Sequence, residues 1–317
     1  MAPNLLLALL SAFGIHIFRP PVSILIRIAF TLNFFALCCV YLRDFVYEPE
    51  LPWILQAYLL TFVFNGVNCM MCYHWSFRFT YRSEMLATER MNLIVTLLLV
   101  SKAVTAALVV DYVLHREPLF VVEEMTVFMM FVQNHVVYMK VLGSLLSLSE
   151  TIDRLADRLH DSNAVSLTRE VNRQCAELEE KLSFPLKIFH MDYFVIIQCQ
   201  VPIELPRLKC SGSSPYYIYG MVESFMIFFL LAYAGEVVAV SCKRFRRRLC
   251  RTKQYTQVSL WNVQLFRRQV HGINLAFGTP LGLKAFYQFM SVTHGLAMVV
   301  FQTVLTYAGC ETRGEIE

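Results

Sequence analysis

Residues 216–251 read YYIYGMVESFMIFFLLAYAGEVVAVSCKRFRRRLCR, and this stretch decides the fold class of the chain. Its first part, 216–240, is an apolar run long enough to cross about 30 Å of hydrocarbon as a helix. Its last part places six cations among the nine residues 243–251. An apolar run that ends in a basic cluster is typical of a transmembrane helix whose basic end stays in the cytosol. We therefore expect a membrane protein.

The same pattern recurs along the chain. Of the 317 residues, 56% are hydrophobic and 16% are charged, whereas a soluble domain carries about 25% charge. The charged residues collect between apolar runs, which predicts an all-α polytopic membrane protein that forms a single domain over residues 1–317. The seven predicted transmembrane helices cover residues 24–42, 53–72, 92–114, 120–146, 185–205, 216–240 and 284–309.

Lys and Arg set the predicted orientation. Most of those in the connections fall on the side that also holds the N-terminus, which predicts a cytosolic N-terminus and an external C-terminus. The first apolar run, 5–17, is too short to cross the bilayer. We expect it in the cytosol or at the membrane interface; a cleaved signal peptide is the alternative.

Several function classes are disfavoured. The formal net charge of +4 arises from basic residues in the connections, where the positive-inside bias explains them better than nucleic-acid binding does. The sequence holds no GxSxG, HExxH or P-loop motif and no cluster with metal-ligand spacing. We expect neither an enzyme nor a cofactor or metal site.

Two long connections are predicted to form helices in the cytosol. In residues 148–184, apolar side chains recur with helical period on both sides of a break at Ser162 and Asn163. These positions are Leu148, Ile152, Leu155, Leu159, Leu167, Val171, Cys175, Leu178 and Leu182. The apolar stripes need a partner in water. Both a hairpin packed on itself and packing between subunits remain open.

The second connection, 242–283, begins with the basic cluster. Such clusters bind anionic membrane lipid or simply anchor a helix, and the neighbouring Cys242 and Cys250 are candidates for palmitoylation. Further along, an apolar face that ends at Phe277 predicts an amphipathic helix over 258–277, before Gly278, Thr279 and Pro280.

Polar residues inside the predicted membrane helices form two sets. Lys140, Asp192 and Glu236 lie at a similar depth and predict a buried ion network. The second set lies in the middle or outer half of the membrane and predicts a small-molecule pocket, with hydrogen bonding between helices as the alternative. The candidate ligand-binding residues are Tyr58, Lys102, Gln133, Gln198, Tyr219 and Glu223.

The layout resembles the insect gustatory and odorant receptor superfamily from about residue 23 to residue 309. The resemblance consists of seven helices with a cytosolic N-terminus, long cytosolic helices, an amphipathic helix before the last span, and Thr306-Tyr307 within that span. The Gln-Phe pair that gustatory members carry after this Thr-Tyr is replaced by Arg313-Gly314. The stretch Ala234-Gly235-Glu236 is also similar to odorant members.

The resemblance implies a ligand-gated, non-selective cation channel of the plasma membrane for small-molecule tastants or odorants. It implies a homotetramer or a heterotetramer with other receptor subunits. It also implies that 148–184 and 242–283 form a shared cytosolic anchor, and that 284–309 is the pore helix. Gln302, Thr306 and Tyr307 are then pore-lining positions. A secondary transporter, whose buried charges couple substrate to an ion, is the alternative. A non-conducting receptor subunit is a third interpretation.

Overall fold

The structure is a computed structural model. It describes residues 5–13, 15, 20–47, 53–78, 89–114, 118–195, 215–252, 273–274, 280–284, 286–288, 290–291, 294–295, 298–299 and 302. Its elements are α1 (Leu5–Ala12), α2 (Pro20–Tyr47), α3 (Trp53–Arg78), α4 (Glu89–Val113), α5 (Pro118–Asp157), the 3-10 helix η2 (Asp161–Asn163), α6 (Ala164–Val195), α8 (Pro215–Leu249), β1 (Ile273–Asn274) and β2 (Pro280–Leu281).

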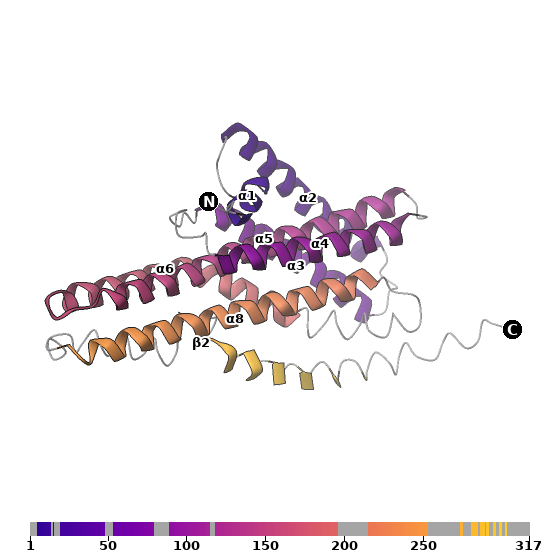
Figure 1. The fold of residues 1–317 in the computed structure, drawn as a ribbon. Coiled ribbons are helices and arrows are strands. Elements are labelled where there is room, and N and C mark those ends of the chain that lie inside the picture. Colours follow the sequence, from indigo (N-terminus) through magenta and orange to yellow (C-terminus); the bar gives the residue numbers. More distant parts are fainter. Residues whose placement is uncertain are drawn as a thin grey trace.

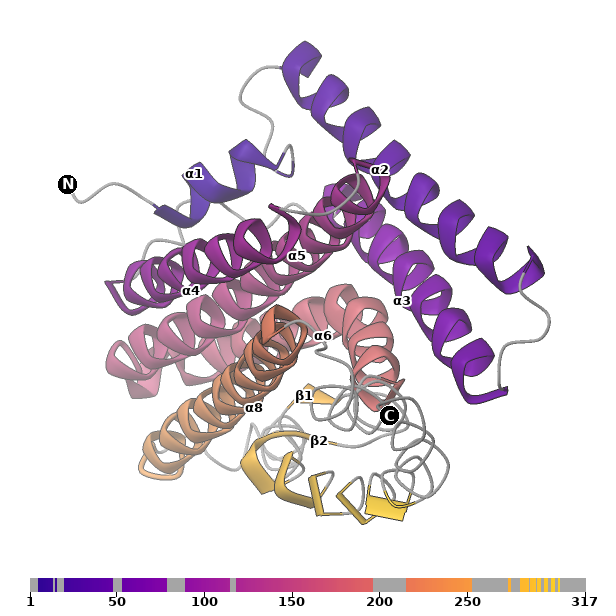
Figure 2. The ribbon, with the colours of Figure 1, turned by 90° about the vertical axis from the view of Figure 1, so that its right-hand side faces the viewer.

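The long helix α5 is the centre of the bundle. It packs most extensively against α8 and also contacts α2, α3, α4 and α6. Figure 1 shows α5 and α8 running side by side over most of their lengths, and Figure 2 shows α2 and α3 as a second pair. The central part of α5 is buried because neighbouring helices surround it, so Val137, Val141 and Leu145 have no exposed surface.

Within the described residues, four helices are long and apolar enough to cross a membrane. They contain the segments Val22–Arg43, Met91–Asp111, Glu124–Asp157 and Val222–Leu249. These segments correspond to four of the predicted transmembrane helices, and the protein is an α-helical membrane protein on this ground.

The other three predicted transmembrane helices are described in part. The window 53–72 is helical throughout as part of α3, although α3 is not among the four candidates. In the window 185–205, α6 accounts for 185–195 and the rest lies outside the described residues. In the window 284–309, the described residues, which end at 302, are helical.

Helix α1 packs against the bundle. Leu6 and Leu10 are buried, and α1 contacts α4 and α5. The Leu5 amide donates a hydrogen bond to Asn92 Oδ1 at 3.2 Å, and the Tyr73 hydroxyl donates to the carbonyl of Phe13 at 2.9 Å. These contacts tie the N-terminal run to α3 and α4.

The two helices predicted over 148–184 are confirmed, and η2 joins them into a hairpin. Helix α5 continues to Asp157, and η2 contains the expected break at Ser162 and Asn163 before α6 begins. The predicted apolar stripe is the buried one, since Leu148, Ile152, Val171, Cys175, Leu178 and Leu182 are at most 1% exposed. We call α5 from Leu148 onward, η2, α6 up to Phe184 and α8 from Cys242 onward the extension bundle.

The basic end of α8 belongs to this extension bundle. Arg244 lies 3.2 Å from Asp153 of α5, and Arg248 pairs with Asp157 one turn further along both helices. Of the two candidates for palmitoylation, Cys242 is fully buried, which argues against its modification, and Cys250 is exposed. Two cations of the basic cluster therefore form ion pairs that join α8 to α5.

The predicted amphipathic helix over 258–277 is wrong at its end. Residues Ile273–Asn274 form an antiparallel pair with Pro280–Leu281, so the chain is extended there, and 258–272 lies outside the described residues. Leu281 is buried against Gly235 of α8, where a Cβ atom would overlap the Leu281 carbonyl oxygen. The lack of a side chain at Gly235 lets the β pair approach α8 closely.

Candidate functional site

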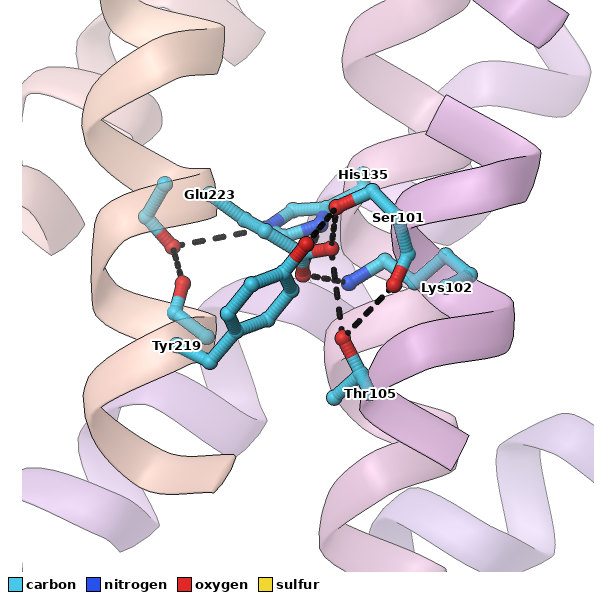
Figure 3. Close-up of polar contacts among 8 residues, drawn as sticks. Ser101, Lys102, Thr105, His135, Tyr219 and Glu223 are labelled. Atoms are coloured by element: carbon cyan, nitrogen blue, oxygen red, sulfur yellow. Dashed lines mark hydrogen bonds and ion pairs between the residues drawn. The ribbon is translucent and has the colours of Figure 1, made fainter. Parts of the chain in front are cut away.

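A buried carboxylate, Glu223 on α8, is the centre of a polar cluster between three helices. Ser101, Lys102 and Thr105 reach it from α4, and His135 reaches it from α5 (Figure 3). Lys102, Thr105, His135 and Glu223 are all buried. We call Ser101, Lys102, Thr105, His135, Tyr219, Glu223 and Ser224 the Glu223 cluster.

The α4 side chains occupy both oxygens of the carboxylate. Lys102 Nζ donates to Glu223 Oε2, and Ser101 Oγ donates to Oε1. Thr105 Oγ1, which also donates to the Ser101 carbonyl at 3.0 Å, lies 3.3 Å from Oε1. A charged carboxylate loses its hydration when it is buried, so it needs hydrogen-bond donors of this kind in place of water. The ion pair between Lys102 and Glu223 joins α4 to α8.

Tyr219 extends the cluster by one turn of α8. Its hydroxyl lies 3.2 Å from Ser101 Oγ. The single hydroxyl proton of Ser101 is donated to Glu223, so the Tyr219 hydroxyl is the donor in this contact. Tyr219 therefore supports the carboxylate through Ser101.

His135 approaches Glu223 from the α5 side. Its Nδ1 atom lies 3.8 Å from Glu223 Oε2, and its Nε2 atom lies 3.3 Å from Ser224 Oγ. The Ser224 hydroxyl also donates to the Gly220 carbonyl at 3.0 Å. Nδ1 has no hydrogen-bond partner among the described residues.

The cluster lies within the apolar part of the bundle. Lys102 is close to the middle of the candidate span Met91–Asp111, and Glu223 lies near the start of Val222–Leu249. On α4, Val100 and Val104 are exposed beside it, as expected for a surface in contact with lipid. Ionisable residues at such a depth are functional candidates because their burial must be compensated.

Three of the predicted ligand-binding residues, Lys102, Tyr219 and Glu223, are brought together. Gln133 is not part of the cluster: it is fully buried on α5 and faces Tyr73 of α3. Residues two apart on a helix point in nearly opposite directions, so Gln133 and His135 cannot both face α8.

The structure describes few of the other predicted site residues. Tyr58 lies within α3, with its side chain outside the described residues, and Gln198 lies outside them altogether. Among the predicted pore residues, Gln302 is helical and exposed, whereas Thr306 and Tyr307 lie outside the described residues. Their roles stay predictions.

The predicted ion network is described only in part. Lys140 Nζ donates to the Ser76 carbonyl at 2.6 Å, near the end of α3. The carboxylate of Glu236 lies beside Gly282, where a Cβ atom would be 3.0 Å from Oε2. The Asp192 side chain lies outside the described residues, so the network of the three stays a prediction.

Sequence reasoning missed Ser101, Thr105, His135 and Ser224. Ser101 and Thr105 are four residues apart and share a helix face with Lys102. This helical spacing of polar residues could have indicated that all three belong to one site. His135 was identifiable only as a titratable residue in an apolar run. Its partnership with α8 follows from the packing of α5 against α8.

No protein-family model matches the chain, and no curated protein matches it in sequence. Within the described residues, no group of three His, Cys, Asp or Glu side chains could hold a metal ion.

Proposed function

We propose that this protein is a chemosensory receptor of the gustatory type, a ligand-gated, non-selective cation channel of the plasma membrane that detects small-molecule tastants or odorants. The observation that carries the proposal is the position of the Glu223 cluster on helices that continue into the extension bundle. Glu223 and Arg248 belong to the same helix, α8, and His135 and Asp157 belong to α5.

The cluster supplies the chemistry for ligand binding. Ser101, Tyr219 and Thr105 carry neutral hydroxyl groups around a buried ion pair, and a polar ligand can replace the contacts of Ser101 and Thr105 with Glu223 and that of Tyr219 with Ser101. Such replacement changes how α4 is held to α8. A ligand shifts a conformational equilibrium only by its difference in affinity for the two states, and this contact provides such a difference.

The extension bundle supplies the second part of the proposal. Its buried stripe and the pairs Arg244–Asp153 and Arg248–Asp157 hold the ends of α5 and α8 together. If α8 moves at the cluster, its other end therefore stays attached to α5. In the proposed channel, the N-terminus is cytosolic, seven helices cross the membrane and four subunits assemble. Gln302, Thr306 and Tyr307 then line the pore.

Whole-cell current tests the proposal. Cells that express this chain alone are exposed to sugars, bitter compounds and volatile odorants while second-messenger signalling is blocked. A fast cation current that survives the block supports a ligand-gated channel, and Glu223→Gln should shift its dose response at unchanged surface expression. Glu177→Gln, on the exposed face of α6, is the matched control. Silence despite confirmed surface expression contradicts a channel formed by this chain alone.

The buried Lys102–Glu223 pair beside His135 also favours a second candidate, a secondary transporter that couples substrate to a proton or ion. A substrate-dependent flux of labelled solute without channel current would favour this alternative. Currents that scale with the cation gradient and show no solute uptake would exclude it.

A further inference from the structure

The hydrogen bonds of Ser224 determine which nitrogen of His135 carries a proton. The Ser224 hydroxyl has one proton, and it donates that proton to the Gly220 carbonyl at 3.0 Å. The oxygen of Ser224 is then an acceptor for His135 Nε2, which lies 3.3 Å away. A neutral imidazole has only one N–H group, so Nδ1 carries a free lone pair.

This lone pair faces another acceptor. Nδ1 lies 3.8 Å from Glu223 Oε2, and neither the imidazole, which is 2% exposed, nor the carboxylate is open to water. Among the described residues, Nδ1 has no hydrogen-bond partner. Two buried acceptors side by side are unfavourable, and a single proton between them satisfies both.

We propose that His135 and Glu223 form a proton-binding site, in which one proton from water bonds to Nδ1 and is donated to Oε2 (Figure 3). Within the described part of the chain, the charged groups that act on His135 are Lys102 from α4 and Glu223 from α8, and the Ser224 hydroxyl of α8 lies against its other nitrogen. On α5 itself, the next buried carboxylate, Glu124, is eleven residues away. With neutral His135, the charges of Lys102 and Glu223 cancel, and proton uptake makes the cluster positive.

Proton uptake changes which helices the carboxylate connects. Oε2 is also the acceptor of Lys102 Nζ, so a protonated His135 competes with Lys102 for the same oxygen. The proton strengthens the link from α5 to α8 and weakens the link from α4 to α8. Acid should therefore loosen α4 from α8. If the proposed function holds, acid also changes ligand sensitivity; the proton site itself does not depend on that function.

Nitrogen NMR of the full chain tests the site directly. The protein is labelled with ¹⁵N-histidine, placed in lipid nanodiscs and recorded over a series of pH values, and His135 is identified by the signal lost in His135→Gln. We expect the Nε2–H tautomer at neutral pH and a single transition to the doubly protonated ring on acidification. An Nδ1–H tautomer at neutral pH, or a ring that does not titrate, would overturn the proposal. The tautomer is read in the native chain, and the variant serves only to assign the signal.

Variants show whether Glu223 is the partner. Glu223→Gln removes the negative charge and should lower the proton affinity of His135 about tenfold or more. Lys102→Met removes a positive charge and should raise it. His74→Gln, which removes an exposed histidine on α3, is the control and should leave the His135 transition unchanged. An unaltered transition in Glu223→Gln would overturn the assignment of the carboxylate.

A current measurement separates this proposal from the proposed function. In a conducting receptor, external acid should shift the dose response of the native protein, and the shift should be lost in His135→Gln. A chain without any current contradicts the proposed channel and leaves the NMR result as the test of the proton site. An acid shift of the same size in His135→Gln would overturn the link between the site and gating.

Discussion

The Glu223 cluster and the extension bundle share α5 and α8 and have opposite distributions of polarity. Around the cluster, charges are buried and apolar side chains such as Val100 and Val104 of α4 are exposed. In the extension bundle, Ile152 and Leu178 are buried and charged side chains such as Arg173 and Arg248 are exposed. This reversal is the pattern expected where helices pass from lipid into water.

The two regions therefore use charge differently. At the cluster, Lys102 and Glu223 are each less than 10% exposed, and each compensates the burial of the other. In the extension bundle, Arg173 pairs with Glu170 and Glu177, where water screens all three. We expect substitutions of charge to be costly in the first region and nearly neutral in the second.

The largest effect is expected for Lys102→Met, which leaves Glu223 charged and unpaired inside the bundle. The free energy of unfolding should fall by about 3–5 kcal/mol, as when one partner of a buried pair is removed. Thermal unfolding of the purified protein in detergent measures the loss. The double variant Lys102→Met/Glu223→Gln should recover most of it. A single variant as stable as the native protein would show that the pair contributes little.

A slightly smaller effect is expected for Val100→Lys, which places a cation on the exposed face of α4. Val100 is 58% exposed near the middle of a candidate span. Insertion of this helix into a membrane should be less favourable by about 2.5–3.5 kcal/mol. A glycosylation-based insertion assay measures this change. Ala176→Lys, at an exposed position of α6, is the control and should be tolerated. Equal tolerance at both positions would contradict a lipid-facing α4.

An intermediate effect is expected for Gly235→Ala on α8. The added Cβ atom would overlap the Leu281 carbonyl oxygen, so the β pair must move away from α8. Overpacking of this kind costs about 1–3 kcal/mol. Limited proteolysis of the segment around Leu281, together with the thermal midpoint, measures the effect. Gly220→Ala, also on α8 but without a neighbouring atom in the way, should change neither.

The smallest effect is expected at Glu177 in the extension bundle. The hydrogen bond from Lys181, at 2.5 Å, lowers the pKa of Glu177 below 4.5. Because the pKa is lower in the folded protein, this contribution is fully present above pH 4.5 and is lost as the pH falls through the folded pKa. Glu177→Gln should reduce stability by less than about 0.5 kcal/mol at neutral pH. Its difference from the native protein should vanish in acid.

The hairpin of the extension bundle was predictable because its information is local. Leu148, Ile152, Val171 and Cys175 repeat with helical period, and the break at Ser162 and Asn163 falls where that period stops. Helix periodicity depends only on neighbours along the chain. The burial of these residues in the structure confirms the prediction.

The Glu223 cluster was predictable in part. Lys102 and Glu223 are conspicuous because charges within apolar runs are rare, and both were placed in the candidate pocket. The choice of His135 over Gln133 was not predictable. The two lie on opposite sides of α5, and only the packing of α8 and α3 decides which faces the carboxylate. The strand at Ile273–Asn274 was missed for a similar reason, since it pairs with Pro280–Leu281 and rests on Gly235.

The sequence by itself determined that this is a helical membrane protein, which segments are apolar enough to cross a bilayer, and which face of the extension hairpin is buried. These properties follow from hydropathy and periodicity, which act over a few turns of one helix. Only the tertiary structure decided that Ser101, Lys102, His135 and Glu223 meet, and that Arg244 and Arg248 pair with α5. Those contacts join residues up to 122 positions apart, and their formation depends on how the helices pack.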